Sequence, residues 1–471
     1  MLNPLVAVLI LIAGIVICFA RRDKALIAFL AASILIPMDQ VLLIGSLHFP
    51  MLRILILFGM LRLLTRRTHS PKNFLSGGIN KIDVAVILFA LFTAINGALL
   101  FQETAALVFQ LGVLYTTLGV YFVMRLLIWE EEDVQRMIRV LAWLASGIAA
   151  VMIYERATGF NPYALLEGAR ASVYASVMQR EDRFRAMGCF AHPILAGTFG
   201  AIVLPLFVGL WWKSKRHRVI AGVGLVSATI ITLASNSSTP MLGYIAGVAA
   251  LCLWPFRHRM RQIRWAVVGV LVSLHLAMKA PVWHLISRID LAGGSSSYHR
   301  YQLVDSCIRH FSDWWLIGVK TTGGWGWDMW DTANQYVSIA DTSGLAPLLL
   351  FLATIVFAFQ CLGRARKCAP ERNRELFLWG LGSALFANVV AFFGISYFDQ
   401  TSVVWYALLA GISAATLASR NEKVVQPQCL AEPSSQNPAW DDLQPSLSSQ
   451  MITAAHPDYQ SEGSLLTKLE S

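Results

Sequence analysis

The chain has 471 residues, of which 56% are hydrophobic and only 14% are charged. Soluble domains carry roughly 25% charged residues, so this composition excludes an ordinary soluble protein and indicates one whose apolar faces meet lipid. The formal net charge is +10, but the basic residues are scattered between apolar segments, which favours contact with membrane surfaces over nucleic-acid binding.

Apolar blocks recur along the chain. A hydrocarbon core about 30 Å thick needs roughly 20 apolar residues in a helix, and backbone groups in lipid must be satisfied within their own segment. We therefore predict an all-α fold, a polytopic helical membrane protein with about 12–13 transmembrane helices. An alternative for residues 25–65 is one re-entrant hairpin. The predicted helix cores are 2–20, 25–37, 50–65, 83–101, 106–128, 138–153, 193–212, 219–235, 239–256, 265–283, 343–361, 376–395 and 402–419.

Lysine and arginine are distributed unevenly between the connecting loops. They are frequent in loops such as 21–24, 213–218 and 257–261, whereas the short loops 102–104 and 236–238 contain neither residue type. Positively charged loops remain in the cytoplasm. This bias predicts an N-terminus outside and a C-terminus in the cytoplasm. The first apolar segment lacks a preceding basic region, so we interpret it as a retained anchor and not as a cleaved signal peptide.

Two long outer loops interrupt this pattern, the first from about 155 to 192 and the second, larger one covering 284–342 with short predicted helices. Long loops on one face of a helical bundle are where a membrane enzyme would hold its polar chemistry. The tail is rich in Ser, Gln and Pro, and is predicted to be disordered and cytoplasmic. The predicted parts are N-terminal transmembrane helices with the first outer loop (1–182), a core with the large outer loop (183–361), C-terminal transmembrane helices (362–420) and the tail (421–471).

The first outer loop contains several arginines, against the charge rule. Arg183 and Arg185 lie shortly before the apolar segment that starts at Pro193. Each could pair with a nearby acidic side chain or with lipid phosphate. A guanidinium also offers a rigid fork of donors that suits a diphosphate at any working pH. His192 directly precedes the apolar segment and is a candidate for proton transfer.

The large outer loop is predicted to contain a helix from about 298 to 314. Its apolar positions recur every three or four residues, and a polar stripe that includes His299 and Arg309 has similar spacing, which is typical of a helix on the membrane surface. Arg300 stands near its start, either as a snorkelling interfacial charge or as a ligand for a substrate. Trp325 lies in a tryptophan-rich stretch that suits the headgroup belt or stacking on a sugar ring.

The sequence contains no phosphate-binding glycine loop, zinc signature or redox cofactor motif, so we expect neither a cofactor nor a metal. The seven cysteines show no metal-ligand spacing and no disulfide framework. Cys189 and Cys307 are both predicted on the outer side, where they could pair, but unpaired buried thiols are the favoured interpretation.

Three motifs, in this order, make the chain resemble the O-antigen ligase and O-antigen polymerase family. The first, Arg-x-x-Gly-x-Phe-x-His-Pro, occupies 185–193. The second is Arg300 at the start of an outer helix, followed by Leu-Ile-Gly-Val-Lys at 316–320. The third is Ala-Asn-Gln-Tyr at 333–336, followed by Gly-Leu at 344–345 and an apolar segment. The resemblance covers most of the chain and is specific mainly between about 183 and 360.

The resemblance implies a glycosyltransferase of the bacterial inner membrane that acts at the outer face. It would move a glycan from a polyprenyl-diphosphate-linked saccharide donor onto a saccharide or lipid acceptor, without a nucleotide or metal, alongside other polysaccharide-assembly proteins. Arg185 and Arg300 match the family's diphosphate-binding arginines by position. The catalytic candidates are Arg300, Arg185, His299 and His192, and the substrate-binding candidates are Arg183, Arg309, Trp325, Asn334 and Tyr336.

Two departures from the family pattern affect these assignments. The family's loop His-Asn reads Ala333-Asn334 here, so a histidine that could activate the acceptor is missing. The family's Ser-Arg-Gly element reads Ser-Asn-Ser-Ser-Thr at 235–239, without its arginine. The outer-face candidates for a replacement base are His299, His192 and Asp331.

A transporter of saccharide or of a small anion is the alternative function. Its decisive polar groups would lie inside the spans, near the midplane of the membrane. Arg53, Asn96 and Asn388 are the candidates for such groups. Because the polar residues are concentrated in the outer loops instead, the sequence favours the enzyme.

Overall fold

The computed structural model of the chain describes residues 2–45, 47–65, 75–166, 178–180, 183–288 and 297–417. Helices dominate these residues. The strands among them form two short antiparallel hairpins, β1 (Val41–Ile44) with β2 (Leu47–Pro50) and β3 (Gln179–Arg180) with β4 (Arg183–Phe184). The all-α prediction is thus confirmed for the described part of the chain, and the predicted tail 421–471 lies outside it.

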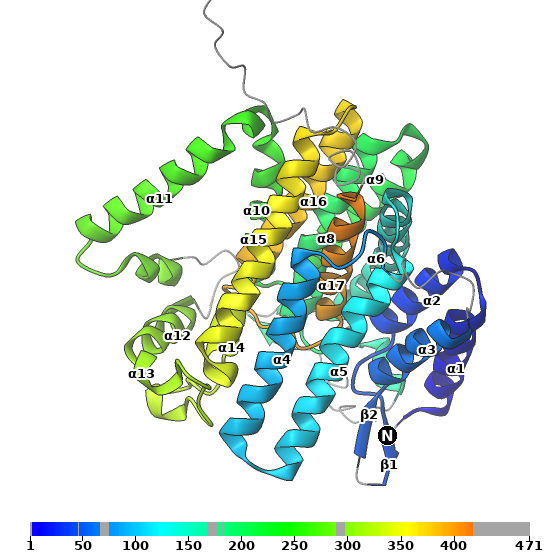
Figure 1. Cartoon of the computed structure of the whole chain (residues 1–471), viewed down its shortest axis with the longest axis horizontal. Helices are drawn as coiled ribbons and strands as arrows, with labels where there is room; N and C mark the ends of the chain where they lie inside the picture. The colour runs from blue at the N-terminus through cyan, green and yellow to red at the C-terminus, as the bar shows by residue number, and fades with distance from the viewer. Residues whose placement is uncertain are drawn as a thin grey trace, which may run out of the picture. The chain divides into compact units, whose positions relative to one another are not determined.

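Each predicted span coincides with a helix or with most of one (Figure 1). The helices of the first part are α1 (Pro4–Phe19), α2 (Arg22–Leu35), α3 (Met51–Thr65), α4 (Lys81–Phe101), α5 (Thr104–Leu127) and α6 (Glu131–Thr158). Those of the second part are α8 (Pro193–Lys213), α9 (Arg218–Ala234), α10 (Ser238–Cys252), α11 (Met260–Ala277), α15 (Leu345–Lys367), α16 (Arg372–Ala391) and α17 (Gln400–Ala415).

Shorter helices connect these elements. Five of them follow α11 and precede α15, in the part of the chain where the sequence predicts short helices. The short elements are η2 (Pro162–Leu166), η3 (Lys215–His217), η4 (Trp254–Arg259), η5 (Val282–Arg288), α12 (Ser297–Arg309), α13 (Phe311–Trp314), η6 (Gly323–Trp325) and α14 (Gln335–Ser343).

Six of the described helices are long and apolar enough to cross a membrane, namely α4, α5, α6, α8, α9 and α15. A seventh span results if α10 and α11, which meet at an angle of 77°, are counted together. These helices fit a multi-pass membrane protein. The larger predicted number includes shorter helices such as α1 and α17, each with 16 residues, fewer than the roughly 20 that a straight span needs.

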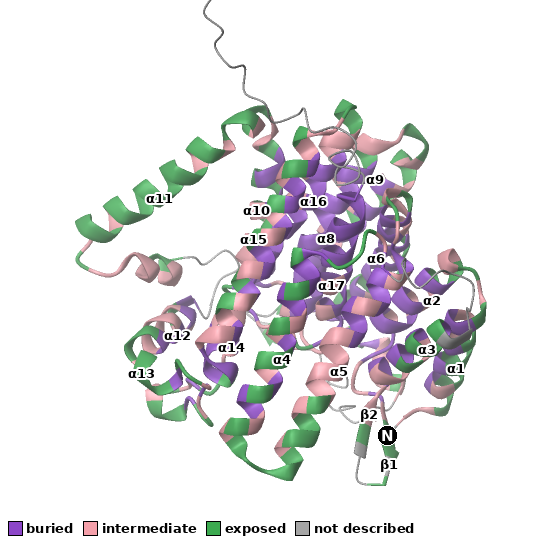
Figure 2. Cartoon of the chain, in the orientation of Figure 1, coloured by how far each residue is buried: buried purple, intermediate pink, exposed green. Residues whose placement is uncertain are grey.

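The interior of the bundle is formed by α8 and α17, which are buried along most of their length (Figure 2). Where α8 crosses α16, Gly209 faces Gly380, and a Cβ atom added to Gly380 would lie 2.7 Å from the Cα atom of Gly209. Such close crossings through small residues are common between membrane helices. In contrast, α11 has no buried residue and leaves the bundle (Figures 1 and 2).

Charged side chains gather at one end of the bundle, which we call the ionic end. Glu131 at the start of α6 pairs with Lys213 at the end of α8 and with Arg374 at the start of α16. Glu375 pairs with Arg257, which follows α10, at 3.1 Å. The distribution of basic residues predicts that these helix ends lie on the same side of the membrane. The ion pairs between them agree with that prediction.

We expect this end to be cytoplasmic, and single-cysteine variants test the assignment. In a chain without its native cysteines, a Cys in place of Trp327, which is 91% exposed, should react in intact cells with a thiol reagent that cannot cross membranes. A Cys in place of Trp440 in the tail should react only after permeabilisation, because the basic loops hold the tail inside. Reaction of position 440 but not 327 in intact cells would reverse the predicted orientation.

A fully buried ion pair joins α4 to α5. Arg125 Nε donates to Asp83 Oδ1 at 3.0 Å, and both side chains are inaccessible to solvent. Asp83 also accepts hydrogen bonds from the Tyr121 hydroxyl and from the backbone N–H of Asn80. A second nitrogen of Arg125, Nη2, donates to the backbone oxygen of Gly78 at 3.3 Å. This network fixes α4 and α5 relative to each other near the ionic end.

Replacing Asp83 by alanine is expected to lower the free energy of unfolding by about 3–5 kcal/mol, because Arg125 is left buried without its counter-charge. The double variant Asp83→Ala/Arg125→Met is the control and should recover a large part of the loss, since no buried charge remains. Thermal unfolding of the detergent-purified protein measures both variants. Equal loss in the single and double variants would contradict this explanation.

Candidate functional site

Residues 185–192, between β4 and α8, are held in place by two buried carboxylates. Glu155 near the end of α6 accepts hydrogen bonds from two backbone N–H groups of this segment, at 2.8 and 3.0 Å. Asp399, which caps the start of α17, accepts a third at 3.3 Å. Burial raises the pKa of Asp399 to about 6, so it is largely ionised at neutral pH. The segment therefore presents Arg185 at one end and His192 at the other from a fixed backbone.

Arg185 extends to the turn between α9 and α10. Its Nη2 atom donates to Ser237 Oγ at 2.6 Å, and its Nε atom donates to the backbone oxygen of Ser235 at 3.5 Å. Ser237 Oγ in turn donates to the same Ser235 oxygen at 2.9 Å. The hydroxyl-rich stretch 235–239 lacks the arginine of the family's Ser-Arg-Gly element. It instead orients the guanidinium of Arg185, which comes from another segment.

Arg300 approaches the same turn from α12. It lies on the buried face of that helix and is only 8% exposed. Its Nε atom donates to the backbone oxygen of Gly394 at 3.3 Å, and the same oxygen accepts from Thr239 Oγ1 at 3.3 Å. A Cβ atom added to Gly394 would lie 2.3 Å from Thr239 Oγ1, so this approach requires glycine. We call Arg185, Arg300, Ser235, Ser237, Thr239 and Gly394 the arginine cluster.

Two arginines supply the charged groups of the arginine cluster. No aspartate or glutamate occurs between residues 183 and 289, the stretch that contributes Arg185 and the turn 235–239. In the hydrogen bonds described above, both guanidinium groups donate to neutral oxygens, so these bonds do not neutralise their charge. Because arginine stays protonated at any working pH, the cluster suits an anionic group.

His192 is a hydrogen-bond donor at Nε2, the ring nitrogen farther from the backbone. Its Nδ1 atom accepts from the backbone N–H of Ile194 at 3.1 Å and so caps α8. Only an unprotonated nitrogen can accept, so the neutral ring carries its proton on Nε2. Burial, together with the nearby charge of Arg185, lowers the pKa of His192 to about 4. At neutral pH, His192 can therefore donate a hydrogen bond from Nε2 but cannot take up a proton there.

His299 has the same tautomer as His192, but its hydrogen bond uses the other ring nitrogen. Its Nε2 atom lies 3.0 Å from the backbone oxygen of Asp331, and a carbonyl oxygen can only accept, so Nε2 carries the hydrogen. The neutral ring therefore has Nδ1 as its acceptor. The side chain of Asp331 is exposed, and Asp331 orients the histidine through its backbone. In His192 the hydrogen bond to the backbone uses the acceptor nitrogen Nδ1, whereas in His299 it uses Nε2, so His299 is the histidine better suited to accepting a proton.

Two other predicted binding residues contact the connection between α16 and α17. Asn334 caps α14 by accepting from two backbone N–H groups, and its Nδ2 atom donates to the backbone oxygen of Phe393 at 3.2 Å. The Tyr336 hydroxyl donates to the backbone oxygen of Val389 at 2.9 Å. These bonds hold the end of α16 and the residue directly before Gly394, so both residues support the arginine cluster through the backbone.

The remaining predicted residues lie in other surroundings. Arg309 pairs with Asp305 at 2.7 Å and is 72% exposed, and Arg183 is exposed on β4. Trp325 stacks on His310 with ring centres 5.4 Å apart. The open tryptophan rings of this region are instead Trp327 and Trp330, which are 91% and 74% exposed.

Sequence reasoning also missed Glu155 and Asp399, the two carboxylates that hold the segment 185–192. A usable signal was present for each, since each is an isolated acidic residue at the end of an apolar block, where charges are uncommon without a function or a partner. The bond from Thr239 to the backbone of Gly394 left no such signal.

Cys189 and Cys307 are both buried and neither forms a disulfide, which confirms the favoured interpretation. Burial raises the pKa of both thiols. Within the described residues, no group of three or more His, Cys, Asp and Glu side chains is arranged to hold a metal ion. No family model matches the chain, and no curated protein matches it in sequence.

Proposed function

We propose that the protein is a membrane glycosyltransferase that polymerises or ligates saccharides carried on a polyprenyl diphosphate, in exopolysaccharide or O-antigen biosynthesis. Arg185 bonds to the turn 235–239, and Arg300 bonds to the Gly394 oxygen that also accepts from Thr239 of this turn; this proximity of the two arginines supports the proposal. When the bond between sugar and diphosphate breaks, negative charge develops on the leaving group, and fixed cations at that point lower the barrier. Two guanidinium groups held on two adjoining segments fit that requirement.

The two histidines then take complementary roles in the proposed reaction. An acceptor hydroxyl attacks the anomeric carbon of the donor, and Nδ1 of His299 takes the hydroxyl proton. The bond from the anomeric carbon to the diphosphate oxygen breaks, and the diphosphate leaves with the bonding electrons. Nε2 of His192 donates a hydrogen bond to the leaving group beside Arg185. The products are an extended or ligated glycan and polyprenyl diphosphate.

In this proposal, the reaction takes place at the outer face of a bacterial inner membrane. The α9–α10 turn, the α16–α17 connection and the segment 185–192 are all at helix ends opposite to those joined by the ion pairs of the ionic end. If the ionic end is cytoplasmic, the arginine cluster is on the periplasmic side, where a diphosphate headgroup of a flipped lipid carrier would lie.

The transporter alternative receives less support. Arg53 donates to Thr116 Oγ1 at 3.3 Å, Asn96 donates to the backbone oxygen of Ser343 at 2.6 Å, and Asn388 accepts from the Tyr397 hydroxyl at 3.1 Å. These bonds lie in three different parts of the bundle. They join neighbouring segments, whereas the arginine cluster holds two arginines on two adjoining segments, the turn 235–239 and Gly394.

Reconstitution of the purified protein tests the proposal. With a polyprenyl-diphosphate-linked oligosaccharide as donor and an oligosaccharide acceptor, we expect a longer glycan and an equal amount of polyprenyl diphosphate, which mass spectrometry can measure. Liposomes without protein are the control. Transport of free saccharide into the liposomes, with the donor lipid left intact, would contradict the enzyme and favour the transporter.

A further inference from the structure

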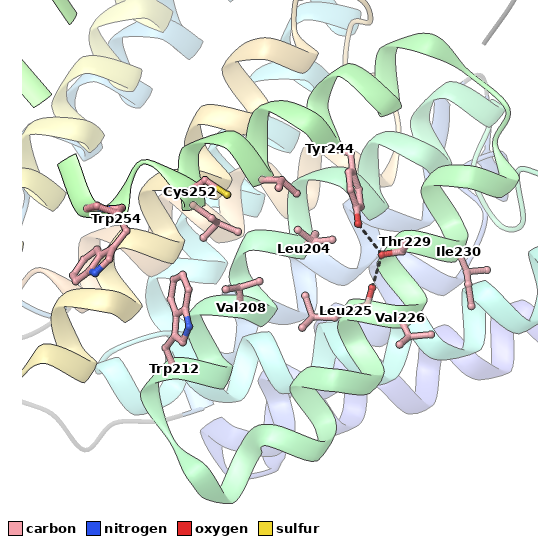
Figure 3. Close-up of a pocket in the computed structure, with 13 residues that line it drawn as sticks. Leu204, Val208, Trp212, Leu225, Val226, Thr229, Ile230, Tyr244, Cys252 and Trp254 are labelled. Atoms are coloured by element: carbon pink, nitrogen blue, oxygen red, sulfur yellow. Dashed lines mark hydrogen bonds between the residues drawn. The ribbon is translucent and has the colours of Figure 1, made fainter. Parts of the chain in front are cut away.

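An apolar groove of about 740 Å³ lies between α9 and α10 on the surface of α8 (Figure 3). Its lining is almost entirely apolar. At one end, the Thr229 and Tyr244 hydroxyls form a hydrogen bond of 3.1 Å that joins α9 to α10. Val226 at its rim is 62% exposed, so the groove opens sideways, where a bilayer would present hydrocarbon chains. The lining includes Leu204, Val208, Trp212, Leu225, Val248 and Trp254.

On α8 and α10, the groove runs from the middle of the helix to the ionic end. Its lining on α8 ends at Trp212, directly before Lys213, and continues beyond α10 to Trp254 in η4. The bond between Thr229 and Tyr244 lies on the other side, toward the turn 235–239. The groove is therefore placed for a lipid of the leaflet at the ionic end, and it is separated from the arginine cluster.

Positive charge surrounds the groove at the ionic end. Lys215 and Arg216 in the α8–α9 connection and Arg218 at the start of α9 are exposed. Arg257 lies over the ring of Trp254, 4.4 Å from its centre, but its charge is compensated by the ion pair with Glu375. The α8–α9 connection contains no acidic residue, so the positive charge beside the groove comes from Lys215, Arg216 and Arg218. An anionic headgroup would meet complementary charge here, whereas a zwitterionic headgroup would gain less.

We propose that this groove is a binding site for one anionic phospholipid of the leaflet at the ionic end. One acyl chain occupies the groove between α9 and α10. The phosphate-bearing headgroup lies against Lys215, Arg216 and Arg218, and the indoles of Trp212 and Trp254 lie at the level of the headgroup, as tryptophan does at membrane interfaces. The site is independent of the proposed glycan transfer.

Native mass spectrometry of the full-length protein, in detergent with equal amounts of phosphatidylglycerol and phosphatidylethanolamine, tests this site. We expect one phosphatidylglycerol to be retained in preference. Val208→Trp and Val248→Trp, which fill the groove, should each abolish retention. Val267→Trp on α11, where Val267 is 52% exposed and outside the groove, is the control and should retain the lipid.

Charge removal gives a second, matched comparison. The variant Lys215→Gln/Arg216→Gln/Arg218→Gln should lose the preference for phosphatidylglycerol by at least about fivefold, the effect of losing one basic contact to an anionic membrane surface. The control variant, Arg364→Gln/Lys367→Gln/Arg372→Gln, removes three exposed basic residues from the facing ends of α15 and α16. It should keep the preference for phosphatidylglycerol.

Three results would overturn the proposal. The first is retention of phosphatidylglycerol by a folded groove-filling variant at the wild-type level. The second is an equal loss of preference in the two triple variants, which would show a general charge effect. The third is retention of phosphatidylethanolamine, or of a polyprenyl diphosphate, in place of phosphatidylglycerol. Elution of each variant as a single size-exclusion peak shows that it is folded.

Discussion

Replacing Arg300 by alanine is expected to lower glycan transfer by about a hundredfold or more, and the same change at Arg185 should have a similar effect. Each removes a fixed donor from the place where the leaving diphosphate gains charge. Arg→Lys variants should be clearly impaired but better than Arg→Ala, because lysine keeps the charge and lacks the bidentate fork. The measurement is transfer in membranes that contain each variant at matched protein level.

The lysine variants distinguish binding of the diphosphate by Arg185 and Arg300 from the simplest alternative. If the two arginines are only interfacial anchors, lysine should serve as well as arginine, since both side chains snorkel. Arg288→Ala is a suitable control, because Arg288 is an exposed arginine in η5, shortly before α12. Full activity in Arg300→Ala would contradict diphosphate binding by this arginine and would also remove the main support for an enzyme.

Replacing His299 by alanine is expected to lower transfer by about a hundredfold, the usual effect of losing a positioned base. The reason is the hydrogen bond from Nε2 to the backbone of Asp331, which leaves Nδ1 as the acceptor. Transfer by the wild-type protein and by His299→Ala at matched protein level checks this statement.

His192→Asn is the matched comparison, because asparagine can still cap α8 but lacks the Nε2 donor. We expect a loss of roughly tenfold, the effect of one hydrogen bond to a charged group. If His192→Asn lowers transfer more than His299→Ala does, the two roles are reversed and the assignment of His299 as the base is wrong.

Much of the fold could be predicted from sequence because its signal is local. An apolar block of about 20 residues has to form a helix in lipid, and α4, α8 and α15 occur where such blocks lie. The uneven distribution of basic residues placed Arg185 and Arg300 on the same side of the membrane. The two arginines lie on adjoining segments because of tertiary contacts, and the backbone oxygen of Gly394 that joins these segments leaves no trace in the sequence.

The orientation of α12 shows a second limit. Its apolar stripe includes Tyr301, Val304 and Ile308, yet these residues are half-buried or exposed, and the fully buried face includes Arg300 and Leu303. In water, an apolar stripe identifies the face that packs against the protein. Beside a membrane, lipid solvates apolar side chains equally well, so the stripe alone does not determine which face is buried.

The buried pair of Asp83 and Arg125 also has a consequence for biogenesis. Asp83 belongs to the first turn of α4 and Arg125 to the last turn of α5, and only two residues connect these helices. During synthesis, α4 leaves the ribosome with an unpaired carboxylate that is unfavourable in hydrocarbon. The charge is compensated only when α5 has been made. The two helices therefore partition from the translocon into the bilayer most favourably as one hairpin, after translation of both.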